Sequence, residues 1–216
     1  MMGYLAKQLQ QLLLLWMGLW LCVAVSANPI VLDNKTTAMT LSKDIEYFAD
    51  NSLEYTLDDL QYEAKRGVNR WQKANGFIPN YGFTKAAYWV KVTLNNQTNH
   101  TDWILHFEYP LMDQLQLYTL NANQQYALQY TTGDAYPFSQ RPIKDRGFAL
   151  PIHLQAQQTQ TIYLRLQSRD SMIISMSLLT PDAFRGEQQN ESFWFGMYYG
   201  AVLIILLFNA YLYFML

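Results

Sequence analysis

Residues 88–94 read Tyr-Trp-Val-Lys-Val-Thr-Leu, and this stretch indicates the fold class. Its even-numbered positions are apolar, while Trp89, Lys91 and Thr93 alternate with them. A period of two is typical of a β-strand that buries one face. The segment therefore predicts a strand whose even-numbered residues face a core and whose Trp89 lies on the opposite face.

Six further stretches repeat this alternation, separated by turns rich in Asn, Gln, Gly and Pro. They are residues 103–109, 115–118, 126–130, 148–154, 161–166 and 172–178. Seven or eight short strands with little helix predict a mainly β protein, a sandwich of two sheets that each bury one face. One helical turn is expected before them, because Thr56 can cap residues 57–60 and their two acids favour a helix N-terminus.

The charged residues divide the 216-residue chain into three parts. Of the 32 Asp, Glu, Lys and Arg residues, 31 lie between Asn28 and Ser192, and the exception is Lys7. Half of all residues are apolar and the net charge is −2. These values exclude a disordered chain and a nucleic-acid binder driven by basic charge. We expect one exported domain, residues 28–185, between two apolar ends.

Residues 1–27 have the layout of a secretory signal peptide. Lys7 precedes the apolar run 12–23, and the small residue Ala27 stands at a plausible cleavage position. The alternative is an uncleaved N-terminal anchor. Cys22 is the only cysteine, so the mature domain would have none. This excludes disulfides, Cys–zinc sites and thiol catalysis in that domain.

Residues 193–216 contain no charge and, as a helix, are long enough to cross a bilayer. Trp194, Tyr198 and Tyr199 would form an aromatic belt at the outer interface. We expect residues 186–192 to be a short polar connector between the domain and this first transmembrane helix. Because no Lys or Arg follows the helix, we also expect a truncated receptor that continues with further helices and a cytoplasmic output.

Five blocks of sequence occur in order within the exported part. They are residues 82–96 (GFTKAAYWVKVTLNN), 103–113 (WILHFEYPLMD), 133–142 (GDAYPFSQRP), 164–168 (LRLQS) and 180–184 (TPDAF). Together they resemble the periplasmic sensor domain, extracellular type 2, of bacterial seven-transmembrane receptors with diverse intracellular signalling modules.

The resemblance carries expectations about fold, location and output. It implies a jelly-roll-like β-sandwich, similar to carbohydrate-binding modules, followed by the first transmembrane helix. It places the receptor in the bacterial inner membrane with the sensor domain in the periplasm. It also implies a cytoplasmic output such as a diguanylate cyclase, a histidine kinase or a phosphatase.

A sugar site needs flat aromatic rings and planar hydrogen-bonding groups. Candidate ring platforms are Trp71, Tyr81, Trp89 and Tyr109, and the alternative for each is a place in the core. Arg165 is a further candidate for ligand binding, although a solvated sheet face also explains it.

Residues 133–146 form the segment densest in polar groups. Arg141 and Arg146 can hold a carboxylate or neighbouring hydroxyls with their rigid forks of donors. The alternative is that both arginines pair with Asp134, Asp145 or a carbonyl and pin a long loop.

We expect neither catalysis, nor a metal, nor a cofactor in this chain. His100, His106 and His153 lack metal-ligand spacing, and no phosphate-binding loop or nucleophile elbow is present. The leading hypothesis is a sensor that binds a carbohydrate or another small polar molecule and passes the signal into the membrane.

The second hypothesis is an interaction module that binds a partner receptor, or its own copy as a homodimer, through an exposed sheet face. A carbohydrate-binding module that acts alone is disfavoured by the membrane helix. We expect no nucleic-acid partner.

Overall fold

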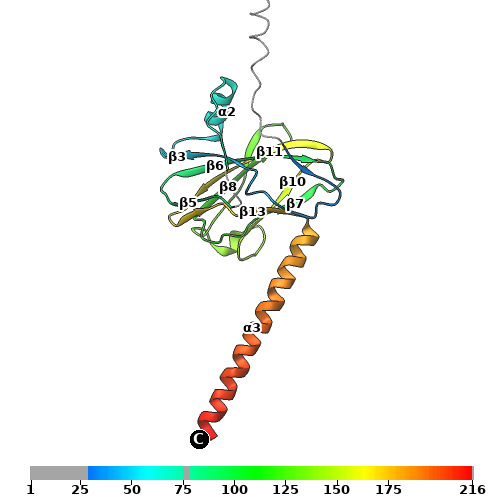
Figure 1. Cartoon of the computed structure of the whole chain (residues 1–216). Coiled ribbons are helices and arrows are strands. Elements are labelled where there is room, and N and C mark those ends of the chain that lie inside the picture. The colour runs from blue at the N-terminus through cyan, green and yellow to red at the C-terminus, as the bar shows by residue number, and fades with distance from the viewer. Residues whose placement is uncertain (1–28, 75–77, 216) are drawn as a thin grey trace, which may run out of the picture.

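The computed structural model describes residues 29–74 and 78–215. Two sheets pack face to face, and a long helix leaves the sandwich at the C-terminal end (Figure 1). The predicted mainly β, sandwich-like architecture is therefore confirmed. The predicted signal peptide, residues 1–27, lies outside the described residues.

The larger sheet has seven strands with β6 and β11 at its centre. Its order is β4 (Gln72–Lys73), β3 (Glu46–Asp50), β6 (Ala87–Asn96), β11 (Gln158–Gln167), β8 (Gln114–Leu120) and β9 (Tyr126–Thr132), with β1 (Ile30–Leu32) beside the end of β6. β1 runs parallel to β6, and the other pairs are antiparallel. β1 and β3 share one side of β6, because β3 pairs with residues 87–91 and β1 with residues 94–96.

The smaller sheet has four antiparallel strands. Its order is β10 (Phe148–His153), β7 (Asp102–Phe107), β13 (Met176–Leu179) and β2 (Ala38–Thr40). A separate pair joins β5 (Asn80–Phe83) to β12 (Ser171–Ile173). The strand predicted at residues 172–178 is thus two strands, since β12 pairs with β5 while β13 pairs with β7. The other six predicted strands are all observed.

The inner faces of the two sheets form one apolar core. Val90, Val92 and Leu94 of β6 are at most 1% exposed, and Trp103 and Leu105 of β7 are fully buried. The three β6 residues are positions that the sequence assigned to the core. Full burial of one such side chain contributes about 1.5–3 kcal/mol, so the sandwich holds together through this core.

Each outer face is covered in part by a helix. α2 (Leu57–Lys65) lays Leu57 and Leu60 over Trp89 on the larger sheet. On the smaller sheet, Phe184 packs against Ile104 and Leu179. Phe184 belongs to α3 (Pro181–Met215), so α2 and α3 attach to opposite sheets. In Figure 1, α2 lies at the top of the sandwich and α3 leaves from the bottom.

The predicted helix cap at Thr56 is confirmed. The Thr56 hydroxyl accepts from the backbone N–H of Asp59, and the Asp59 carboxylate accepts from the backbone N–H of Thr56. This capping box satisfies donors that the first turn would otherwise leave unpaired.

α3 runs without interruption from Pro181 to Met215. The polar connector expected at residues 186–192 is therefore itself helical and continuous with the apolar segment. α3 is long and apolar enough to cross a membrane by length and composition. A displacement of the sandwich can reach the apolar segment through a single rigid element.

Candidate functional site

The outer face of the larger sheet carries two adjacent rows of aromatic and polar side chains. The first row is Phe48, Trp89, Arg165 and Gln116, and the second is Glu46, Lys91, Tyr163 and Tyr118. The strand register produces both rows, because Arg165 and Tyr163 of β11 each lie opposite a residue on β6 and a residue on β8. Side chains directly opposite in antiparallel strands lie about 4.5–5.5 Å apart at Cβ. We call these eight residues the sheet-face rows.

Tyr163 is the centre of an aromatic group on this face. Its ring centroid lies 4.8 Å from that of Tyr126, edge to face, and 5.8 Å from that of Trp71. Burial raises the pKa of the Tyr163 hydroxyl well above its usual range, and the neighbouring Tyr126 and the Glu46 carboxylate raise it further. The phenol therefore stays protonated and can donate a hydrogen bond.

Lys91 holds the edge of this group in place. Its ammonium lies 2.5 Å from the carboxylate of Glu46, which is only 6% exposed, and 5.4 Å from the ring centroid of Trp71. A cation over an indole face is attracted to its π-system. Lys91 thus neutralises a buried acid and fixes Trp71 beside Tyr163.

Trp89 lies on the predicted face but is covered. It is 1% exposed beneath Leu57 and Leu60, and its ring centroid is 5.6 Å from that of Tyr118. A ring in this position offers no surface to a sugar while α2 stays docked. Its indole N–H and the side-chain amide nitrogen of Gln61 are buried without a hydrogen-bond partner among the described residues.

Arg165 lies beside two side-chain amides. Its guanidinium donates to the oxygens of Gln114 at 3.3 Å and Gln167 at 3.4 Å, both near the limit for a hydrogen bond. Gln114 in turn donates to the hydroxyl of Tyr136 at 2.8 Å. Arg165 is half-buried and has donors left for a ligand.

Arg141 pins the connection between β9 and β10, residues 133–147, which we call the 133–147 loop. Its guanidinium donates to the carbonyls of Asp145 at 2.8 Å, Arg146 at 3.2 Å and Gly147 at 2.9 Å. It also lies over the ring of Phe148, 4.4 Å from the centroid. These contacts are the ones that the structural alternative for Arg141 predicts.

Arg146 and Asp145 tie the 133–147 loop to α3. Arg146 lies 2.5 Å from the Glu191 carboxylate and 4.6 Å from the ring centroid of Phe195. The Asp145 carboxylate accepts from Gln188 at 2.9 Å. We call these contacts the loop–helix joint.

Asp145, at the loop–helix joint, also contacts the smaller sheet. Asp145 lies 3.0 Å from the His106 ring nitrogen on β7 and accepts from the backbone N–H of Gly147 at 2.9 Å. Burial by itself would raise the pKa of Asp145. The hydrogen bonds from Gln188, Gly147 and His106 outweigh that effect and hold the pKa below its usual range. Asp145 therefore stays ionised and connects the sheet, the loop and α3.

Tyr109 belongs to a separate junction, at the end of β7. Burial and the nearby Asp170 raise the pKa of its hydroxyl. Close by in the sequence, the Asp113 carboxylate accepts from the backbone N–H of Arg169 at 2.6 Å, and Ser168 donates to the carbonyl of Leu111 at 2.8 Å. Residues 133–135 also pack on Asp113. Three of the five sequence blocks, residues 103–113, 133–142 and 164–168, therefore meet here.

The structure thus separates the seven candidate residues into four places. Tyr81, on β5, packs against the core with its ring centroid 4.6 Å from that of Tyr88. Trp71, Trp89 and Arg165 share the outer face of the larger sheet, Arg141 and Arg146 share the 133–147 loop, and Tyr109 lies at the Asp113 junction. Sequence analysis overlooked Tyr163, although its two-residue spacing from Arg165 was a usable signal. It also overlooked Tyr118 and Tyr126.

A register shift explains why Tyr126 was not recognised. Leu117 pairs with Tyr130, whereas Tyr118 pairs with Leu128, so Gln129 is an extra residue in β9. The bulge turns Tyr130 toward the core and leaves Tyr126 on the outer face. Strict alternation would have placed both tyrosines on one face.

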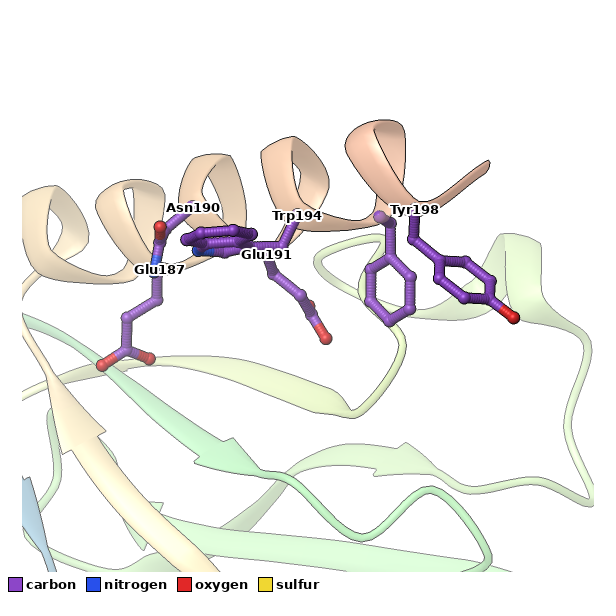
Figure 2. A pocket seen from close by; sticks show the side chains of 6 residues that line it. Glu187, Asn190, Glu191, Trp194 and Tyr198 are labelled. Atoms are coloured by element: carbon purple, nitrogen blue, oxygen red, sulfur yellow. The ribbon is translucent and has the colours of Figure 1, made fainter. Parts of the chain in front are cut away.

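A separate apolar hollow lies along α3 itself. It measures about 600 Å³ and is lined by Glu187, Asn190, Glu191, Trp194, Phe195 and Tyr198. Figure 2 shows that the labelled side chains project from one side of the helix. None of the seven candidate residues lines this hollow, which lies where the charge-free segment begins.

The structure thus joins a β-sandwich to an apolar helix that is long enough to cross a membrane. The family model that matches residues 42–180 is 7TMR-DISM extracellular 2. The match covers more than half of the chain, which therefore belongs to this family of extracellular sensor domains of seven-transmembrane receptors with diverse intracellular modules. No curated protein matches the sequence.

Proposed function

We propose that the domain binds a carbohydrate or another small polar molecule on the outer face of the larger sheet. The observation that carries this proposal is the pair of sheet-face rows, where aromatic rings lie beside amide and guanidinium groups. Rings stack on the apolar face of a sugar, and planar polar groups pair with its hydroxyls. A jelly-roll-like sandwich similar to carbohydrate-binding modules is the finer fold that we propose with it.

A chain of contacts leads from this face toward the membrane helix. Arg165 donates to Gln114, and Gln114 donates to Tyr136 in the 133–147 loop. The same loop holds α3 through Arg146 and Asp145. A ligand that engages Arg165 competes with Gln114 and thereby favours another position of the loop. The ligand shifts this equilibrium only by its differential affinity for the two positions.

The signal then passes to an intracellular module. We propose that the receptor sits in a bacterial inner membrane with the sandwich in the periplasm, and that the output is a diguanylate cyclase, a histidine kinase or a phosphatase outside these 216 residues. In this proposal the chain itself catalyses no reaction and uses neither a cofactor nor a nucleic acid.

Isothermal titration calorimetry tests the binding step. Residues 28–192, which include the whole sandwich core, are titrated with a panel of monosaccharides, oligosaccharides and small carboxylates. Tyr163→Ala should weaken binding of any ligand found by about tenfold, since an aromatic contact contributes roughly 0.5–1.5 kcal/mol beyond its buried area and the lost area adds to this. Phe83→Ala, at a ring that is 83% exposed on β5, is the control and should bind as the wild type does. If none of the ligands in the panel produces a binding heat, the proposal is contradicted.

Self-association is the second candidate, and one observation favours it. β9 is an edge strand of the larger sheet, and its Leu128 is 49% exposed. An edge strand offers unpaired backbone groups to another chain. Analytical ultracentrifugation of residues 28–192 checks this candidate, and a monomer at all concentrations counts against it.

A further inference from the structure

An open hollow of about 860 Å³ lies between the 133–147 loop and α3, next to residue 193, where the charge-free segment begins. It is lined by Phe138, Lys144 and Arg146 from the loop and by Arg185, Gln188 and Phe193 from the helix, together with neighbouring residues. The Arg146–Glu191 contact lies between this hollow and the one shown in Figure 2, since Glu191 lines both.

The position of the hollow along α3 matches the headgroup layer of a bilayer. That layer is about 5–7 Å thick on each side of the hydrocarbon. From Gln188 to Phe193 the helix rises about 7.5 Å, and Phe193 is the first residue of the charge-free segment. Arg146 stacks on Phe195, so its guanidinium lies at the boundary between headgroups and hydrocarbon.

The charges of the hollow favour an anion. Its cations are Lys144, Arg146 and Arg185, and its acids are Asp145 and Glu191. The Asp145 carboxylate already accepts from His106, Gly147 and Gln188, as described above. Among the residues that the structure describes, Lys144 makes no ion pair, while Arg146 pairs with Glu191 and Arg185 with Asp182. The lining therefore holds three cations and two carboxylates, and Lys144 is the cation that a ligand phosphate can engage without breaking an ion pair.

Apolar rings stand beside these cations. Phe138 is 52% exposed and Phe193 is 60% exposed, and both line the hollow. At the headgroup layer of a bilayer, lipid phosphates lie next to the first carbons of the acyl chains. Cations beside aromatic rings can contact both parts of such a lipid. A soluble anion would gain nothing from the two rings.

We propose that this hollow binds the phosphate headgroup of an anionic phospholipid of the outer leaflet. Lys144 and Arg146 donate to the phosphate, and Phe138 and Phe193 contact the first carbons of the acyl chains. The inference rests on the proposed function, in which α3 spans the membrane. A bound lipid competes with Glu191 for Arg146, so the lipid composition changes the loop–helix joint.

The test measures which lipids remain bound to the full chain. The 216-residue protein is placed in nanodiscs of equal parts phosphatidylglycerol and phosphatidylcholine, and native mass spectrometry counts the lipids that it retains. The wild type should retain phosphatidylglycerol preferentially. Lys144→Gln and Arg146→Gln should each lower that preference about fivefold, the effect of one basic residue near an anionic membrane surface.

A control variant removes two positive charges, one more than each test variant, at the opposite end of the sandwich. The double variant Lys65→Gln/Arg66→Gln alters the C-terminal end of α2, which lies away from α3 in Figure 1. This control should keep the wild-type preference. An unchanged preference in the Lys144 and Arg146 variants, or an equal fall in the control, overturns the inference.

Two further outcomes separate this inference from the proposed function. If the chain does not enter nanodiscs, as judged by gel filtration, the membrane span and the lipid site both fail. If the chain enters but shows no lipid preference, the lipid site fails and the sensor proposal stands. Thermal stabilisation by inorganic phosphate in pure phosphatidylcholine nanodiscs, without a lipid preference, assigns the hollow to a soluble anion and also overturns the inference.

Discussion

Gly133 shows how a single residue lets two sequence blocks, residues 103–113 and 133–142, meet. Its φ is +146°, and a Cβ atom there would lie 2.0 Å from the carbonyl oxygen of Asp113. Next to it, the backbone N–H groups of Asp134 and Ala135 donate to the carbonyls of Met112 and Asp113. The loop can cross the end of β8 this closely only because residue 133 has no side chain.

Gly133→Ala should therefore destabilise the domain. Backbone strain costs about 1–3 kcal/mol, and the clash with Asp113 adds to it, so we expect the melting temperature to fall by about 5 °C or more. Gly67→Ala is the control, because Gly67 has a φ of +80° but open space around it. Thermal unfolding followed by tryptophan fluorescence measures both variants, and equal shifts would contradict the role given to the close approach.

Asp145 makes the stability of the domain depend on pH in acid. Its pKa is lowered in the fold from the ordinary value of 3.8, so its carboxylate stabilises the fold above that value. The stabilisation is lost as the pH falls through the lower, folded-state pKa. Asp145→Asn should be less stable than the wild type at pH 7, and the difference should shrink below about pH 4.

Urea unfolding between pH 3 and 7 measures this difference. Asp134→Asn, at an exposed position in the same loop, is the control and should follow the wild type. A difference between Asp145→Asn and the wild type that stays constant across the pH range would rule out the ionised Asp145 as its source.

At the scale of elements, α2 decides whether Trp89 in the sheet-face rows is accessible. Leu57 and Leu60 cover Trp89, and the capping box at Thr56 fixes where the helix begins. Nine residues are too few for an isolated helix to be stable in water. α2 therefore persists through its packing on the sheet, and weakening that packing uncovers Trp89.

Leu60→Ala should lower the free energy of unfolding by about 2–5 kcal/mol, the usual cost of such a cavity. It should also increase the quenching of tryptophan fluorescence by acrylamide, because Trp89 becomes accessible. Leu128→Ala is the matched control, since Leu128 is 49% exposed and its loss should cost less than about 0.5 kcal/mol. If both variants unfold at the same urea concentration, α2 does not protect this face.

At the scale of the whole molecule, the loop–helix joint is a second point of contact between the sandwich and α3. Phe184 anchors the first turn of α3 on the smaller sheet, and the 133–147 loop holds the helix two turns further along. Two attachments of one continuous helix fix its direction. Releasing the second attachment lets α3 pivot about Phe184.

Arg146→Glu should release that attachment. An exposed ion pair contributes about 0.2–1 kcal/mol, so hydrogen exchange at the backbone amides of residues 185–192 should become about two- to fivefold faster. The charge-reversed double variant Arg146→Glu/Glu191→Arg should restore most of the protection. Mass spectrometry of the exchanged chain measures these rates, and a double variant that exchanges as fast as Arg146→Glu would show that the pair itself does not matter.

Much of this organisation could be predicted because it depends on local patterns. Alternation revealed six strands and the buried positions of β6, since a strand repeats every two residues. The uncharged run from Phe193 revealed an apolar helix that can cross a membrane, and Thr56 revealed the start of α2. The five sequence blocks indicated the family that the match at residues 42–180 shows.

The site depended on contacts between residues far apart in the chain. Alternation correctly put Trp89 on the outer face, but only the packing of α2 decided that its ring is covered. The bulge in β9 moved Tyr126 next to Tyr163, and the register of β11 brought Tyr163 between Lys91 and Tyr118. The sequence alone determined six of the strands, the core positions of β6 and the apolar segment that can cross a membrane, because periodicity and hydrophobicity are local properties. Tertiary structure alone decided which aromatic rings meet and where the loop touches α3, because register and docking are set by the packing of the whole domain.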